Sequence, residues 1–98
     1  MLFIVRFTDK PGKLAIRQQF LPAHLEYLKQ HRALIRVAGS LRLEPDAAPV
    51  GATWVVEAGN KKEIEDLLLS DPFWVHGLRQ SVEILRWSKA FPDHKVAI

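Results

Sequence analysis

Four short runs of apolar, β-branched and aromatic residues recur along the chain and are typical of strands. These runs are Leu2–Thr8, Leu34–Leu43, Thr53–Ala58 and Leu78–Trp87. Side chains of a strand alternate between its two faces, so Phe3, Val5 and Phe7 would share one face while Arg6 lies on the other. We therefore predict four strands.

A longer amphipathic stretch between the first two runs predicts a helix from Leu14 to Arg32. We expect Pro22 to break this helix and restart it, because proline lacks the N–H group that an interior helical position needs. Beyond that break, Leu21, Leu25 and Leu28 would form the buried stripe.

A second helix is predicted between the third and fourth runs, with Asn60 as its N-cap and Ser70 near its end. Asp71 and Pro72 then stop this helix and begin a short helical turn, which Gly77 closes. The order is β-α-β-β-α-β, which indicates an α+β, ferredoxin-like fold with a four-stranded antiparallel sheet.

The whole chain, residues 1–98, reads as one domain with a core at about 2–87 and a tail at 88–98 that shows little periodicity. Two helices cover only one face of such a sheet. Yet apolar residues occupy both faces, since Val55 alternates with Trp54, and Leu85 and Trp87 alternate with Ile84. We expect a homodimer that packs two sheets face to face; the alternative is a tail that folds back over the open face.

Composition excludes several classes of site. The chain has 98 residues and no cysteine, which rules out disulfides, thiolate nucleophiles and cysteine-bound metals and fits a reducing compartment. No apolar run approaches the roughly 20 residues that cross a bilayer, and Arg6 interrupts the opening one. We expect no membrane association and a cytoplasmic location.

The charge pattern does not indicate nucleic-acid binding, although the net charge is +3 and the pI about 9.5. Basic residues are scattered among acids, as where Lys61 and Lys62 precede Glu63, and no strand carries spaced aromatics beside them. The pattern favours small anionic ligands over nucleic acids. We also expect no nucleotide cofactor, because no glycine-rich phosphate loop is present.

We expect no metal either. His24 and His31 would share a helix face but lie two turns apart, about 10 Å by helical rise, which is too far for one ion. The other two histidines show no metal-ligand spacing.

Several segments together resemble the YciI-related (YCII) family over about residues 2 to 87. The segments are Pro22-Ala23-His24-Leu25, Ala38-Gly39-Ser40, the strand that Gly51 leads, Asp71-Pro72-Phe73 with Gly77-Leu78, and Val82-Glu83-Ile84. The resemblance implies a dimeric α+β barrel with a cleft that contains a histidine and an aspartate as its proposed active site. One branch of the family eliminates hydrogen chloride from a chlorinated hydroxyhydroquinone.

The family histidine matches His24 and the family aspartate matches Asp71. His24 could act as a general base or acid, since imidazole titrates near neutral pH. We place it at the margin of the buried stripe; the alternative is a boundary histidine bonded to a backbone carbonyl. Asp71 could orient the His24 ring, cap the short helix, or do both, because a carboxylate has two oxygens.

Other candidates would position a substrate. Ser40 stands where many relatives have proline, and it is substrate-orienting or merely structural. Arg6, and more weakly Arg17, could hold a carboxylate or phenolate. Arg6 could equally pair with an acid on a neighbouring strand or subunit.

The resulting hypothesis is a cofactor-independent enzyme of the lyase or isomerase type that acts on a small, cyclic or aromatic acid. His24 would move the proton, Asp71 would orient it, and Arg6 or Ser40 would hold the substrate. The alternative is a non-catalytic dimeric module for ligand binding or interaction, in which Asp71 is only a cap.

Overall fold

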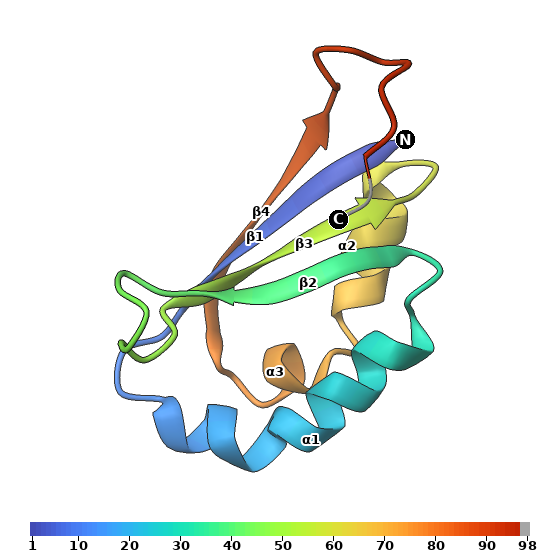
Figure 1. The fold of residues 1–98 in the computed structure, drawn as a ribbon. Coiled ribbons are helices and arrows are strands. Elements are labelled where there is room, and N and C mark those ends of the chain that lie inside the picture. The colour runs from blue at the N-terminus through green and yellow to red at the C-terminus, as the bar shows by residue number, and fades with distance from the viewer. Residues whose placement is uncertain (97–98) are drawn as a thin grey trace.

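The computed structural model describes residues 1–96, and its helices lie together on one side of a single sheet (Figure 1). The elements are β1 (Leu2–Asp9), α1 (Leu14–Gln30), β2 (Ile35–Leu41), β3 (Gly51–Glu57), α2 (Lys61–Leu68), α3 (Pro72–Val75) and β4 (Arg79–Trp87). Residues 97 and 98, the end of the predicted tail, lie outside the described residues.

The sheet has the order β2-β3-β1-β4, and all three pairings are antiparallel. The predicted α+β, ferredoxin-like fold is therefore confirmed, with the helices on one face. The predicted strands are also present, although β3 begins two residues earlier than expected, at Gly51, and β2 ends two residues earlier, at Leu41.

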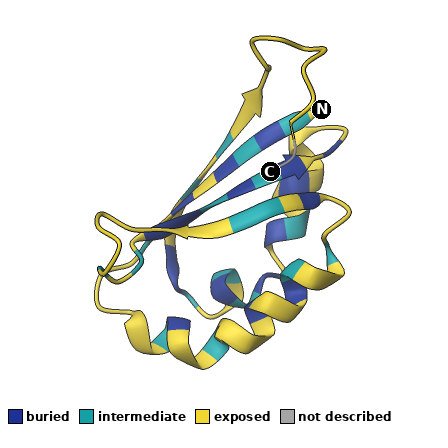
Figure 2. Cartoon of the chain, viewed as in Figure 1, coloured by how far each residue is buried: buried dark blue, intermediate teal, exposed yellow. Residues whose placement is uncertain are grey.

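The core lies between the sheet and the helices, as the dark blue positions in Figure 2 show. Alternation in β1 puts Phe3, Val5 and Phe7 into it, with 5%, 0% and 1% of their surface exposed. Trp54 of β3 packs edge-on against Phe7, with ring centroids 4.8 Å apart. The opposite face of β1 carries Arg6, which is exposed.

The expected break in the first helix is wrong, because α1 continues through Pro22. A proline in a helix leaves the carbonyl four residues earlier without its N–H partner. Here that carbonyl belongs to Gln18, and both residues are exposed, so water can replace the lost bond.

The predicted buried stripe of α1 is wrong for Leu21 and Leu25, although Leu28 is half-buried against the core. Leu21 and Leu25 are 39% and 54% exposed, whereas Arg17, His24 and Tyr27 are the buried residues of the helix. Helical spacing joins positions 17, 24 and 27 on one face just as well as it joins the leucines. His24 therefore lies in the middle of the buried face and not at its margin.

A β-bulge interrupts the pairing of β1 with β4, at the point where the end of β1 lies beside the start of β4. Thr8 pairs with Ser81, but Asp9 pairs with Arg79, so Gln80 is the extra residue. The bulge shifts the alternation of β4 by one, and Arg79 turns toward the helices, where it is 5% exposed.

Tyr27 ties α1 to α2, since its hydroxyl donates a hydrogen bond of 2.5 Å to the carbonyl oxygen of Leu67. Burial raises the pKa of this phenol from 10.0 to about 12. The unfolded chain therefore loses the phenolic proton at a lower pH than the folded chain does. The contribution of the Tyr27 phenol to the free energy of unfolding is therefore complete below pH 10 and is lost as the pH rises toward 12.

We predict that the tyrosinate absorbance of the native protein rises with a midpoint near pH 12, about two units above that of the denatured protein. The measurement is unambiguous because the sequence contains one tyrosine. Tyr27→Phe should lose about 1 kcal/mol of stability with the hydrogen bond, and should weaken the fall in stability between pH 10 and 12. A native midpoint near 10 would contradict the buried, bonded hydroxyl.

Candidate active site

His24 and Asp71 meet in the interior, between α1 and the start of α3. His24 Nδ1 lies 2.7 Å from Asp71 Oδ1, and the two residues are 6% and 0% exposed. A carboxylate can only accept, so the Nδ1–H group donates and fixes the tautomer. The other ring nitrogen, Nε2, is then the one that remains for a ligand.

Asp71 is also the N-cap of α3, as its sequence position before Pro72 predicted. Its Oδ1 atom accepts the backbone N–H of Phe73 at 3.2 Å. The helix cap and the contact with His24 therefore use the same oxygen of Asp71, and not one oxygen each. The second oxygen, Oδ2, is buried and has no hydrogen-bond partner within residues 1–96.

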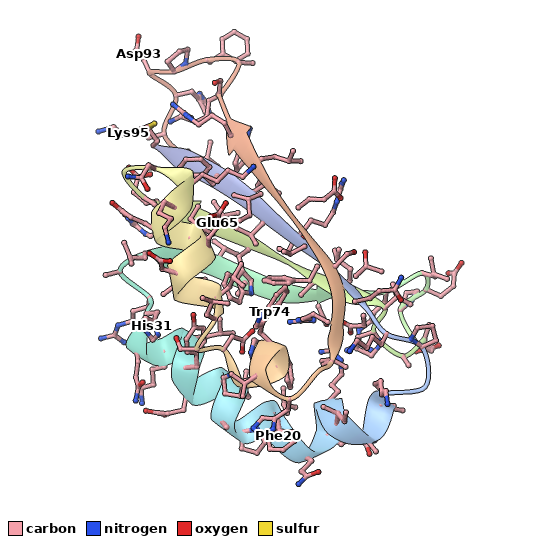
Figure 3. All side chains as sticks on the ribbon, turned by 180° about the vertical axis from the view of Figure 1, so that it is seen from behind. Phe20, His31, Glu65, Trp74, Asp93 and Lys95 are labelled. Carbon is pink, nitrogen blue, oxygen red and sulfur yellow. The ribbon has the colours of Figure 1, made fainter. Side chains whose placement is uncertain are left out.

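The ring of Phe73 joins this pair to a group of charged side chains. It stacks on the His24 ring, with centroids 4.0 Å apart and planes 15° from parallel. The guanidinium groups of Arg17 and Arg79 lie over the same ring, at 5.2 and 5.1 Å from its centroid. Figure 3 shows α3, which carries the labelled Trp74, between α1 and the sheet.

Asp9 holds both arginines. Its Oδ2 accepts from Arg17 Nη2 at 2.6 Å and its Oδ1 from Arg79 Nη1 at 2.7 Å. Only 7% of the Asp9 side chain and 1% of the Arg79 side chain are exposed. Burial lowers the pKa of Arg79 below its usual value, while the hydrogen bond and charge of Asp9 oppose that shift.

A hollow of about 300 Å³ adjoins these groups, at the lower end of the size range of small-molecule sites. It lies between α1 and the β2–β3 side of the sheet. Its lining residues are Arg17, Gln18, Leu21, His24, Leu25, Leu28, Ala38, Gly39, Ser40, Arg42, Pro49, Ala52, Trp54 and Arg79. The wall is therefore apolar except for a histidine, a serine, a glutamine, an indole and three guanidinium groups.

The structure brings His24, Asp71 and Ser40 to one region but not Arg6. Ser40 lines the hollow from β2. Arg6 lies on the opposite face of the sheet, where its Nε and Nη2 atoms donate to Glu83 at 3.0 and 2.8 Å. This placement corrects the expectation that Arg6 shares a substrate site with His24 in one chain; the ion-pair alternative is the one observed.

Sequence reasoning missed Arg79 and Asp9. Counting back from the inward residues Val82 and Ile84 puts position 79 on the outer face, and only the bulge at Gln80 reverses it. Asp9 lies directly after the predicted first strand, Leu2–Thr8, where an acidic residue is common and draws no attention. The sequence did contain one signal. Asp9 follows the first predicted strand and Arg79 lies at the start of the last, so an acid and a base would meet if these strands paired antiparallel.

Neither a metal centre nor a membrane-crossing helix occurs in the described part of the chain. No three histidine, aspartate or glutamate side chains there gather closely enough to bind an ion. None of those helices is long and apolar enough to cross a bilayer.

The family model for the YCII-related domain matches residues 1–88. The chain belongs to the YCII-related family. Its structure is similar to that of 5-chloro-2-hydroxyhydroquinone dehydrochlorinase (TftG) from Burkholderia phenoliruptrix AC1100 in complex with 2,5-dihydroxybenzoquinone. The two share 30% identity over 90% of this chain and 94% of that one, with a TM-score of 0.81.

A more distant structural relative shows the same fold. It is a protein of Bacteroides thetaiotaomicron VPI-5482 named as an antibiotic biosynthesis monooxygenase, with 16% identity, 99% and 95% coverage and a TM-score of 0.58. No curated protein matches the sequence. The predicted resemblance is therefore confirmed, and the distant likeness supports the fold alone.

Asp9→Ala should destabilise the protein by about 3–5 kcal/mol, because it leaves two largely buried guanidinium groups without their carboxylate. Urea unfolding followed by circular dichroism measures the change. Asp66→Ala is the matched control, since it removes an ion pair with Lys62 whose side chains are 73% and 59% exposed, and should have little effect. Equal losses of unfolding free energy in the two variants would refute a structural role for the two buried ion pairs of Asp9.

Proposed function

We propose that this protein is a cofactor-independent enzyme of the lyase or isomerase type, acting on a small cyclic or aromatic acid. The observation that carries the proposal is the buried His24–Asp71 pair beside the hollow, with Nδ1 bonded to the carboxylate and Nε2 left over. Support comes from the similar dehydrochlorinase, whose structure contains 2,5-dihydroxybenzoquinone.

In this mechanism, Nε2 of His24 removes a proton from the substrate and the ring becomes an imidazolium. The negative charge of Asp71, 2.7 Å from Nδ1, stabilises that cation. In an elimination, the electron pair of the broken C–H bond forms the new double bond and the leaving group departs with its own pair. In an isomerisation, the same proton returns to another atom of the substrate.

The surroundings of the pair suit this task. Stacking on Phe73 and the bond to Asp71 fix the plane and the rotation of the His24 ring, so little reorganisation is needed when the proton moves. Ser40 would orient the substrate from the opposite wall of the hollow. It has no role as a nucleophile in this scheme.

A second candidate function is a non-catalytic ligand-binding module. The observation that favours it is the cap contact, because Asp71 Oδ1 accepts the Phe73 N–H and would be needed for the fold alone. In that case His24 serves as a bonded interior histidine, and removing it should leave ligand binding unchanged.

Three substitutions separate these functions. Asp71→Ser keeps a cap oxygen but is too short to reach His24, Asp71→Asn keeps both contacts at one oxygen but removes the charge, and His24→Gln removes the base. In the enzyme, all three should lower turnover, His24→Gln by about 10²–10⁴-fold. The assay follows deuterium incorporation and leaving-group release by NMR with a panel of hydroxyquinones and small aromatic acids.

Nitrogen NMR of the His24 ring gives an independent readout. The neutral ring should carry its hydrogen on Nδ1 in the wild type and in Asp71→Asn, and should revert toward the Nε2–H form in Asp71→Ser. His94→Gln, in the exposed tail, is the control for turnover. Full activity in both His24→Gln and Asp71→Ser would leave only the binding module.

We also infer that a second copy of the chain covers the open face of the sheet. Leu41, Leu85 and Trp87 are 38%, 46% and 36% exposed there. The described tail does not bury its own apolar side chains on that face, since Phe91 and Val96 are 76% and 66% exposed. Exposed apolar side chains on an open sheet face are typical of a twofold contact, and here they share the face with the Arg6–Glu83 ion pair.

Sedimentation equilibrium should therefore give twice the chain mass of 11.2 kDa. Leu85→Asp should shift the protein toward the single-chain mass, because it places a charge in the contact. Leu69→Asp, at a residue 58% exposed at the end of α2, should leave the mass unchanged. A wild-type protein that sediments as one chain at all concentrations tested would rule out this dimer.

A further inference from the structure

The guanidinium group of Arg79 has a free edge. Its Nη1 atom donates to Asp9, but Nε and Nη2 are buried and have no hydrogen-bond partner among residues 1–96. Nε and Nη2 form one side of the planar group and donate in parallel. Arg6 uses the same edge on the other face of the sheet, where both atoms contact one oxygen of Glu83.

Packing holds this edge in place. The ring of Phe7 lies 4.6 Å from the Arg79 guanidinium carbon and the ring of Phe73 lies 5.1 Å from it. Both rings lie within cation–π distance of the guanidinium, and Asp9 binds its Nη1 atom. The Nε–Nη2 edge is the part that remains for another partner, and buried N–H groups of a charged side chain rarely lack one.

Charges at the hollow favour an anion as that partner, because the guanidinium groups of Arg17, Arg42 and Arg79 line it and neither Asp9 nor Asp71 does. Arg17 and Arg79 share the single carboxylate of Asp9, and both of its oxygens are already used. Asp71 is near enough to raise the pKa of Arg79 by its charge, yet no ion pair joins the two within 4.0 Å. Its Oδ1 serves His24 and Phe73, and its Oδ2 is buried without a partner among residues 1–96.

Trp54 carries a second buried N–H donor that lacks a partner within residues 1–96. The indole Nε1–H of Trp54 is buried, and it too has no partner in the portion of the chain that the structure describes. Trp54, Arg79 and His24 all line the hollow. A ligand there would lie against two side chains whose N–H donors are unpaired within the described residues, one from β3 and one from β4, and against a histidine from α1.

We propose that the Nε–Nη2 edge of Arg79 binds two neighbouring substrate oxygens that share a negative charge, and that Trp54 donates to a further oxygen. The oxygen pair is a carboxylate or the adjacent oxygens of an ionised hydroxyquinone. Arg79 is thus an anchor for the anionic end, while His24 acts on the ring. This inference rests on the proposed function, since it concerns the same hollow.

The test measures binding by calorimetry with two matched pairs of probes. Benzoate is compared with benzamide, and 2,5-dihydroxybenzoquinone with its neutral dimethoxy ether. The wild type should bind the anion of at least one pair about tenfold more tightly or better than the neutral probe. Which pair shows the preference tells whether the oxygens belong to a carboxylate or to a hydroxyquinone.

Arg79→Lys keeps the positive charge but loses the parallel donors, so the preference for the anion should fall about tenfold. Trp54→Phe should weaken the hydroxyquinone more than benzoate, which has no oxygen on its far side. Arg6→Lys removes the same kind of two-donor contact on the other face of the sheet and should change neither affinity.

Different results separate this inference from the proposed function. Anion preference that Arg79→Lys abolishes, without turnover in any assay, would uphold the anchor and overturn the enzyme. Turnover that depends on His24, with equal affinities for anion and neutral probes, would overturn the anchor and leave the proposed enzyme standing. If Arg79→Lys does not fold, equal affinities of the wild type for the anion and the neutral probe of both pairs would still overturn the anchor.

Discussion

One oxygen atom, Oδ1 of Asp71, links the folding of the chain to its chemistry. It accepts the N–H that starts α3 and the Nδ1–H of His24, so the helix end and the orientation of the imidazole depend on the same carboxylate. Phe73 reinforces the link, because its backbone is capped by Asp71 and its ring stacks on His24. Residues 47 positions apart in the chain are thereby fixed together.

The buried charges around this pair divide into two sets. Asp71 faces a histidine and, in the proposed mechanism, would stabilise its imidazolium, whereas Asp9 faces two guanidinium groups. Because Asp9 is fully engaged, the free edge of Arg79 keeps its positive character in a wall that is otherwise largely apolar. A low-polarity wall strengthens the attraction between that edge and an anion.

Alternation and turn chemistry in the sequence predicted the strands, the order of elements and the capping role of Asp71, since these depend on neighbours along the chain. The pairing of His24 with Asp71 came from the family resemblance. Arg79 could not be placed, because a single bulged residue, Gln80, reverses the face of a strand end without a mark in the sequence. Pro22 was misleading because it does have a mark in the sequence but no effect on the helix. Water can replace the hydrogen bond that an exposed proline removes.

The misassigned face of α1 is the structural feature that draws most attention to the proposed site. Hydrophobic patterning would bury Leu21 and Leu25, yet the helix turns Arg17 and His24 inward and leaves those leucines at the border of the hollow. Burying a charged or polar side chain costs desolvation free energy even when the group is paired, whereas burying an apolar side chain does not. Departures of this kind concentrate at functional sites, where an interior histidine and guanidinium are needed for what they bind and not for how well they pack.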